Sequence, residues 1–166
     1  MLNCADGNLP VLGALEQQLS KGHIMTVNSA SARYDGLGKT GKGHVSTKSG
    51  ALDAPYGFGT RFEGQPGTNP EEMIAAAHAA CFTMATSFQL AGAGHEAGTL
   101  ETTCQVTLEK DGDGFAVTRS DLSLRGSVSG IDQAEFEKLA HTAKEGCPIS
   151  KLLNCEITLT IEFDQA

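Results

Sequence analysis

Apolar and small residues fill one long stretch near the middle of the chain. Over 73–90 the sequence carries no charged residue apart from His78, if that side chain is protonated. Asn69 suits a helix N-cap, because its side-chain oxygen can accept a hydrogen bond from a backbone N–H without a helical partner. Pro70 suits the first helical position, where no N–H is needed. The pattern predicts one helix over 69–92 that is buried on all sides, since its apolar residues do not fall on a single face.

Alternating apolar and polar residues predict strands after this helix. The alternation runs over 100–108, resumes over 115–128 after a glycine-rich turn, and returns over 155–163. In the middle segment the apolar phase shifts between Val117 and Leu122. A shift of one residue would otherwise turn the buried face outward, so the sequence predicts a β-bulge there.

The remaining segments complete an α+β order. Candidate strands lie at 25–35 and 42–48, and a loop rich in glycine and proline follows over 50–67. A helix with one apolar stripe spans 132–146 behind an aspartate N-cap, and a short helical turn follows over 148–153. The order of strands, long helix, strands, helix and last strand predicts an α+β fold with strands packed against a buried central helix.

Composition narrows the class of protein. The chain has 166 residues and a formal net charge of −8, which fits one domain and argues against nucleic acid or an anionic membrane as a partner. Residues 1–24 show no signal-peptide pattern and are interpreted as an N-terminal extension with a short helix at 8–18, before a single domain over 25–166. Met25 could be an alternative start, and Cys4 is interpreted as incidental. The alanine-rich central helix is too mildly apolar for a membrane span.

The cysteines carry the candidate chemistry. Their number is five, with no CxxC pair, which is unlike a secreted disulfide scaffold and indicates a reducing cytoplasm. Cys81 lies mid-helix, where it is either a small core residue or a reactive thiol. Cys147 precedes Pro148 and therefore caps a helical turn, where backbone N–H groups favour thiolate. The two thiols suggest a redox cycle, although the pattern does not show that they meet. Cys104 and Cys155 are interpreted as core residues.

The glycine-rich loop 50–67 offers a second group of candidate residues. It carries Arg61 between aromatic side chains that include Tyr56, Phe58 and Phe62. These residues either shape a pocket beside the start of the long helix or form a packed surface loop with a solvated arginine. Both interpretations stay open on the pattern alone.

A metal site is a rival interpretation. His78 and Cys81 are three residues apart on one helix, and Cys147 and His141 could complete a set of four ligands. The spacing matches no strong zinc pattern, and a histidine in this position is more often a satisfied core or interface residue. We therefore expect no metal and no cofactor.

Three sequence motifs resemble one known family. The runs PYGFGTRFEG, TNPEEMIAAAHAACF and GCPIS, with the closing EITLT, are similar to the OsmC/Ohr family of thiol-dependent hydroperoxide reductases, closest to its OsmC branch. The similarity extends from about Lys42 to Phe163 and leaves residues 1–24 outside. Through this resemblance the chain is expected to have an OsmC-like fold, to form an intertwined homodimer and to place its active site at the dimer interface.

The resemblance also implies residue roles. Cys81 matches the peroxidatic cysteine and Cys147 the resolving cysteine, while Glu71 and Arg61 match a glutamate and an arginine of the family site. Arg61 could lower the pKa of a thiol near it, and Glu71 could hold the guanidinium by two hydrogen bonds. The implied activity is reduction of organic hydroperoxides in a cytoplasmic stress response, with re-reduction by an external dithiol such as a lipoyl-bearing protein. The alternative is a non-enzymatic small-molecule binder on the same fold.

The apolar residues near these positions predict the substrate class. Phe58, Phe62, Phe82 and Met84 are the candidate pocket residues. An apolar pocket suits an organic substituent, because burial of its surface adds binding free energy. We therefore expect alkyl and aryl hydroperoxides to be preferred over hydrogen peroxide.

The spacing within the long helix sets a geometric problem. Ten residues separate Glu71 from Cys81, which corresponds to roughly 15 Å along a straight helix. An arginine held by Glu71 would hardly reach Cys81 across that distance. Either the helix is broken near its start, or the arginine that serves each Cys81 comes from the other subunit.

Overall fold

The structure, a computed structural model, describes residues 25–165. The N-terminal extension 1–24, the helix expected at 8–18 and Cys4 lie outside the described residues. The elements in chain order are β1 (Ala30–Asp35), the 3-10 turn η1 (Gly38–Thr40), β2 (Lys42–Thr47), β3 (Asp53–Tyr56), α2 (Phe58–Phe62), α3 (Pro70–Gly92), β4 (Gly98–Asp111), β5 (Gly114–Val128), α4 (Gln133–Gly146), α5 (Pro148–Leu152) and β6 (Glu156–Gln165).

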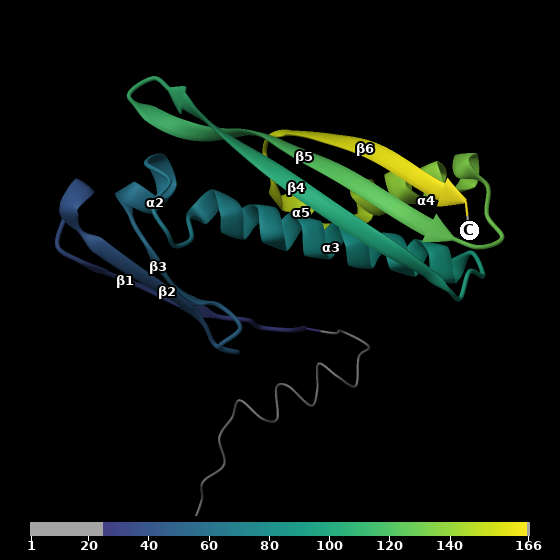
Figure 1. The fold of residues 1–166 in the computed structure, drawn as a ribbon, viewed down its shortest axis with the longest axis horizontal. Coiled ribbons are helices and arrows are strands. Elements are labelled where there is room, and N and C mark those ends of the chain that lie inside the picture. The colour runs from purple at the N-terminus through teal and green to yellow at the C-terminus, as the bar shows by residue number, and fades with distance from the viewer. Residues whose placement is uncertain (1–24, 166) are drawn as a thin grey trace, which may run out of the picture.

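The strands form two separate sheets (Figure 1). The second sheet has the order β4-β5-β6, with β4 antiparallel and β6 parallel to the central strand β5. Thr107 pairs with Arg119 and Leu108 pairs with Val117, which leaves Thr118 as the extra residue of a bulge. The bulge predicted from the shift in apolar phase is therefore confirmed.

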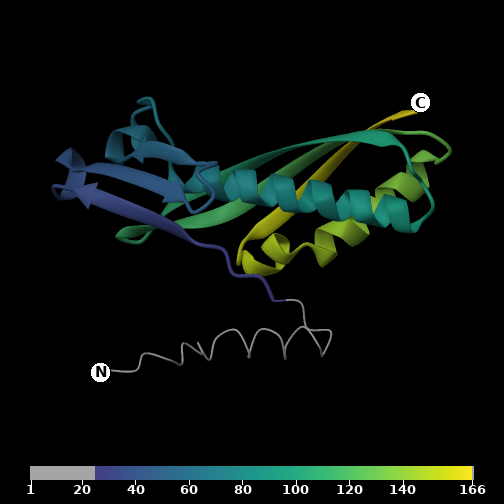
Figure 2. The ribbon, with the colours of Figure 1, turned by 90° about the horizontal axis from the view of Figure 1, so that it is seen from below.

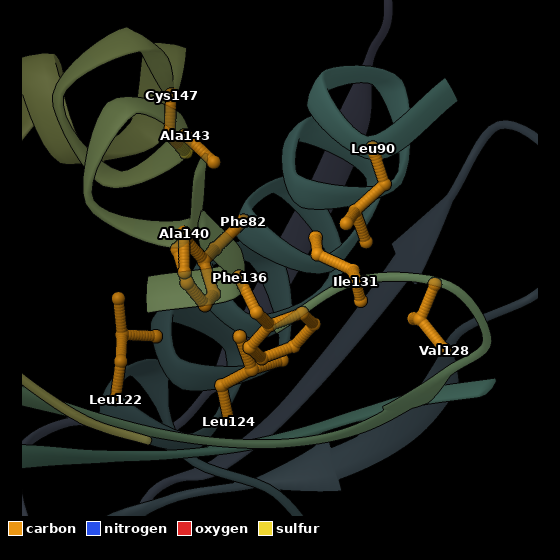
Figure 3. Packing of buried hydrophobic residues seen from close by; sticks show 10 residues of the cluster. All are labelled: Phe82, Leu90, Leu122, Leu124, Val128, Ile131, Phe136, Ala140, Ala143 and Cys147. Atoms are coloured by element: carbon orange, nitrogen blue, oxygen red, sulfur yellow. The ribbon is translucent and has the colours of Figure 1, made fainter. Parts of the chain in front are cut away.

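The hydrophobic core lies between the second sheet and the helices α3 and α4, which pack side by side on one face of it (Figure 2). Figure 3 shows the buried cluster, whose members are Phe82, Leu90, Leu122, Leu124, Val128, Ile131, Phe136, Ala140, Ala143 and Cys147. The ring of Phe136 lies against β5 at Gly126, where an added Cβ would come within 2.2 Å of the ring carbon Cζ. A glycine at this position lets the helix and the sheet approach each other closely.

The helix α3 is less enclosed than its sequence indicates. Its buried positions recur every four residues and are His78, Phe82, Thr86 and Leu90. Met84 and Phe88 on another face are 58% and 70% exposed. The prediction of a helix buried on all sides is therefore wrong for the single chain, because one sheet and one neighbouring helix can cover only one stripe of a helical cylinder. By length and composition alone α3 could cross a membrane, but core helices of globular proteins meet the same test.

The first sheet has the order β1-β2-β3 and is antiparallel throughout. It lies beside the N-terminal part of α3, apart from the second sheet (Figure 1). Every residue of β1 is exposed, and Val45 on β2 is the large apolar residue that this sheet buries. The predicted strand 25–35 is thus shortened to Ala30–Asp35, while the prediction at 42–48 is confirmed within one residue.

The segment 50–67, predicted as a loop, contains the strand β3 and the short helix α2. The sequence analysis missed both elements because the glycine and proline residues of this segment are typical of loops. Pro55 is tolerated because β3 is an edge strand, and its carbonyl accepts a hydrogen bond from the backbone N–H of Thr68 at 2.9 Å. At the start of α2 the Thr60 hydroxyl accepts from the backbone N–H of Gly57 at 2.9 Å. These two bonds fix α2 beside the start of α3.

Candidate active site

The two cysteines singled out in the sequence lie next to each other. Cys81 projects from the middle of α3, and Cys147 lies at the junction of α4 and α5, both of which contact α3. Their Sγ atoms are 2.9 Å apart, compared with about 2.05 Å in a disulfide bond. Cys81 is half-buried and Cys147 is fully buried. The pair is therefore in position to form a disulfide with little movement of the chain.

Local sequence places Cys147 where its sulfur can carry a charge. Cys147 has extended backbone angles and is the N-cap of α5, as the sequence predicts. Burial on its own would raise the pKa of Cys147. Hydrogen bonding with Cys81, the backbone N–H and hydroxyl of Ser150, and the N–H of Ile149 together lower that pKa below its ordinary value. Cys147 is thus the thiol of the pair that one chain makes easier to ionise.

Cys81 shows the opposite behaviour. Burial, followed by the hydrogen bond with Cys147, raises the pKa of Cys81, and the backbone N–H of Ile149 offsets this only in part. Within one chain the Cys81 thiol is therefore harder to ionise than a free cysteine. A single chain does not activate the thiol that family resemblance implies as the nucleophile.

A second pair of residues lies at the start of α3. Arg61 on α2 donates two hydrogen bonds to Glu71, from Nε to Oε2 at 2.9 Å and from Nη2 to Oε1 at 2.5 Å. The side chains are 32% and 13% exposed, and the hydrogen bond with Glu71 raises the pKa of Arg61, which stays charged. The expected two-pronged contact is confirmed. It holds the guanidinium in one orientation.

The N-terminal cap of α3 supports this arrangement. The Asn69 side chain accepts from the backbone N–H of Glu72 at 2.8 Å, as expected for an N-cap. The Glu72 carboxylate accepts a hydrogen bond from the Thr68 hydroxyl at 2.8 Å. Both bonds fix the first turn of the helix from which Glu71 projects.

Arg61 borders a pocket of about 230 Å³ between the first sheet and α2. The lining residues are Tyr34, Gly38, Tyr56, Gly57, Phe58, Arg61, Phe62 and Pro70. The Phe58 and Phe62 rings lie 4.9 Å apart, and the ring of Phe115 at the start of β5 lies 5.4 Å from that of Phe62. The aromatic residues of segment 50–67 therefore shape a pocket, which favours that interpretation over a packed surface loop with a solvated arginine.

Two of the four candidate pocket residues lie elsewhere. Phe82 is fully buried in the core between α3 and the second sheet, so it does not line an accessible pocket. Met84 is exposed on α3 and does not line the pocket at Arg61. Sequence proximity to Cys81 suggested both, but the helical turn directs adjacent side chains to different faces.

The sulfur pair (Cys81 and Cys147) and the arginine pair (Arg61 and Glu71) are not brought together within one chain. The helix α3 continues unbroken from Pro70 to Gly92, so Glu71 and Cys81 stay roughly 15 Å apart along its axis. The alternative of a helix broken near its start is therefore wrong.

Comparison with known proteins identifies the family. The OsmC-like protein family matches residues 62–162. The chain belongs to this family. The peroxiredoxin OsmC of Escherichia coli (strain K12) is 50% identical over 141 residues, which cover 84% of this chain and 99% of that relative. The organic hydroperoxide resistance protein OhrB of Bacillus subtilis (strain 168) is 32% identical over 124 residues, covering 73% of this chain and 88% of OhrB.

The fold agrees with this membership. The crystal structure of OhrB of Bacillus subtilis matches with a TM-score of 0.62 at 29% identity, over 84% of this chain and 98% of OhrB. The resemblance to the OsmC/Ohr family stated from the sequence motifs is therefore confirmed.

The rival metal site is not supported in this OsmC-like chain. Among residues 25–165 no group of three or more histidine, cysteine or acidic side chains is arranged to hold a metal ion. Both ring nitrogens of His78 contact serine hydroxyls, and His141 is exposed on α4. The interpretation of His78 as a satisfied core residue is confirmed.

Sequence reasoning missed one residue of this region. Ser150 lies three positions after the N-cap Cys147 and contributes to lowering its pKa, and the Ser150 hydroxyl lies 2.9 Å from His78 Nε2. The signal was available in the GCPIS motif, because the third residue after an N-cap commonly interacts with the cap.

Proposed function

We propose that this OsmC-like protein reduces organic hydroperoxides to alcohols, with Cys81 as the peroxidatic and Cys147 as the resolving cysteine. The observation that carries the proposal is the 2.9 Å contact between the two sulfurs, from residues 66 positions apart in the chain. Two adjacent thiols, one of them at a helix N-terminus, suit a cycle of oxidation and disulfide formation. The name peroxiredoxin for the Escherichia coli relative supports the same chemistry.

The reaction proceeds in three steps. The Cys81 thiolate attacks the distal oxygen of the hydroperoxide, the O–O bond breaks, and the departing alkoxide takes up a proton to give the alcohol. Cys81 is left as a sulfenic acid. Cys147 then attacks the Cys81 sulfur, which forms the disulfide and releases water. An external dithiol reduces the disulfide by exchange and restores both thiols. Family resemblance points to a lipoyl-bearing protein as that dithiol.

The first step needs a positive charge that one chain does not supply. Burial raises the pKa of Cys81, and Arg61 is held by Glu71 at the far end of an unbroken helical segment. A homodimer meets this need if Arg61 of the partner subunit lies beside each Cys81. The exposed apolar side chains Met84 and Phe88 on α3 favour such an association. The active site would then be shared between two chains.

The pocket beside Arg61 supports an organic substrate. Phe58 and Phe62 line this pocket, and Phe115 packs against the Phe62 ring. Aromatic rings bind alkyl and aryl groups by burying apolar area, which hydrogen peroxide lacks. The name of the OhrB relative, an organic hydroperoxide resistance protein, supports this substrate class.

Intact-mass analysis with one equivalent of an organic hydroperoxide tests the proposal. The reduced protein is expected to lose two hydrogen atoms, a decrease of about 2 Da, as the disulfide forms and one equivalent of alcohol appears. The Cys81→Ser variant is the matched control and is expected to keep its mass. If the wild-type mass and the hydroperoxide both stay unchanged, the protein is a binder rather than a peroxidase.

A further inference from the structure

Two tyrosines form one wall of the pocket beside Arg61. Tyr34 on β1 and Tyr56 on β3 both pair with Gly43 of the central strand β2, so their side chains lie on the same face of the first sheet. Their ring centroids are 5.7 Å apart. Gly43 makes room for the Tyr56 ring, because an added Cβ there would come within 2.4 Å of the ring carbon Cε1. The sheet therefore fixes where the Tyr56 ring lies.

The backbone at Tyr56 is fixed by its neighbours as well. Tyr56 is the last residue of β3 and forms a β-bridge with Thr68, just before α3 begins. The next residue, Gly57, is the N-cap of α2, the short helix that carries Arg61. Tyr56 thus lies at the junction of the first sheet with both helices. A side chain held in this way loses little conformational freedom when it binds a substrate.

The polar side chains that line this pocket are Arg61, Tyr34 and Tyr56, and they differ in what they already bind. Arg61 uses its Nε and Nη2 atoms on Glu71. The Tyr34 hydroxyl donates to the Gly38 carbonyl at 3.1 Å. In the part of the chain that the structure describes, the Tyr56 hydroxyl has no hydrogen-bond partner and is not sealed from solvent. Tyr56 therefore offers a hydroxyl that a substrate oxygen can bind without displacing another bond.

The make-up of the pocket indicates which oxygen of a hydroperoxide meets Tyr56. The organic group is bonded to the proximal oxygen, and the rings of Phe58 and Phe62 that suit this group line the same pocket as Tyr56. The distal oxygen has to face the attacking sulfur. With the organic group against the rings, the proximal oxygen is the one nearer the tyrosine wall.

We propose that Tyr56 is a catalytic residue, whose hydroxyl donates a hydrogen bond to the hydroperoxide oxygen that leaves as alkoxide. This assignment rests on the proposed peroxidase function. The Cys81 thiolate forms an S–O bond with the distal oxygen while the O–O bond breaks, and the electron pair of that bond goes to the proximal oxygen. The Tyr56 hydroxyl stabilises the negative charge that develops there. The alkoxide then takes a proton from water to become the alcohol, and Tyr56 keeps its own proton.

Tyr56→Phe tests the hydroxyl alone, because the ring over Gly43 is kept. Rapid mixing with one equivalent of an alkyl hydroperoxide, followed by quenching and mass analysis, measures the rate of sulfenic acid formation. We expect Tyr56→Phe to slow this step about tenfold, the size expected for loss of one hydrogen bond to a charged oxygen. Tyr34→Phe is the matched comparison and should lose less, since the Tyr34 hydroxyl is already bonded to Gly38.

Two further readouts separate catalysis from structural support. An organic peracid is cleaved to a carboxylate, which needs little stabilisation as it leaves, so Tyr56→Phe should slow peracid reduction by less than about twofold. The thiolate titration of Cys81 should match that of the wild type, because the hydroxyl acts on the leaving oxygen and not on the sulfur. Thermal unfolding should also be unchanged, since the lost hydroxyl has no partner among the described residues.

The inference is overturned if Tyr56→Phe reduces the alkyl hydroperoxide at the wild-type rate. Equal losses with the peracid and the alkyl hydroperoxide, or a loss as large in Tyr34→Phe, would also overturn it. A shifted thiolate titration or a marked fall in the unfolding temperature would show that the hydroxyl acts within the protein instead. A wild type that consumes neither peroxide would overturn the proposed function itself.

Discussion

The sulfur pair and the arginine pair are assembled in different ways within the same chain. Cys81 and Cys147 come from elements far apart in sequence and meet because α3 packs against α4 and α5. Arg61 and Glu71 are ten positions apart, and the fixed start of α3 brings them together. Each pair is complete in its own contacts, but a straight helical segment separates them.

The difference shows which of the two thiols a single chain makes easier to ionise and which it does not. The chain lowers the pKa of Cys147 but leaves Cys81 with a raised pKa. The group that could correct this, the Arg61 guanidinium, is already charged and oriented by Glu71. On this account Arg61 of the second subunit supplies the positive charge that Cys81 lacks within its own chain.

The largest expected effect comes from the sulfur pair. Cys81→Ser should abolish peroxide turnover, because the nucleophile is lost. Cys147→Ser should allow one rapid oxidation and then stall, because the sulfenic acid has no resolving thiol. Steady-state and single-turnover peroxide consumption measure the two outcomes. Cys155→Ser and Cys104→Ser are controls expected to stay near the wild-type rate, and an undiminished rate in Cys81→Ser would contradict the assignment.

Removal of the arginine should have the next largest effect. Arg61→Ala leaves the pKa of Cys81 raised by burial, so less of Cys81 is thiolate at neutral pH. A shift of one to two pKa units would lower the oxidation rate about 10- to 100-fold at pH 7. The rate should recover as pH rises, and the ultraviolet thiolate titration of Cys81 should move to higher pH.

Two observations in this variant would speak against the role of Arg61. One is a thiolate titration of Cys81 that is the same as in the wild type. The other is a rate loss that persists unchanged at high pH. A Glu71→Gln variant provides the matched comparison, because it keeps Arg61 but loses the charge that orients it, and it should show a smaller loss.

A charge on the exposed face of α3 tests the need for a second chain. Met84→Asp places a carboxylate on a side chain that is 58% exposed in the single chain. If this face is covered in a homodimer, burying an unpaired charge there should weaken association and make activity fall on dilution. Met84→Leu preserves the apolar area and should behave as the wild type. Sedimentation measurements showing the same assembly for both variants would contradict an interface at this face.

The smallest effect concerns substrate preference. Phe58→Ala removes one ring of the pocket beside Arg61, which should lower the efficiency with an aryl hydroperoxide about tenfold, by loss of roughly 1–2 kcal/mol of apolar burial. Efficiency with hydrogen peroxide should change little, since it has no apolar group to bind. Competition between the two peroxides measures the ratio. An equal loss for both would show that Phe58 supports the fold rather than the substrate.

Local sequence signals predicted much of the fold. The cap at Asn69, the cap at Asp132 and the N-cap position of Cys147 are all present, because each depends on residues only a few positions apart. The bulge near Thr118 was predictable because a shift in apolar phase reflects the local backbone. The arginine–glutamate contact followed from family resemblance and complementary charge.

Features that depend on distant contacts were not predictable from the pattern. Nothing in the spacing of Cys81 and Cys147 fixed their distance, since it depends on how α4 packs against α3. The exposed face of α3 was missed because the pattern of small and apolar residues is the same whether the chain itself or another subunit covers that face. The contacts of His78 with Ser120 and Ser150 required the tertiary structure, because these residues come from three separate elements.

A mixed dimer tests the shared site most directly. Cys81→Ser and Arg61→Ala chains carrying different affinity tags are combined, and the heterodimer is purified and assayed for organic hydroperoxide reduction. If each site joins Cys81 of one chain with Arg61 of the other, one site carries both defects and the other carries neither. We then expect about half of the wild-type activity. If each site is complete within one chain, every site carries a defect, and activity near zero would contradict the account.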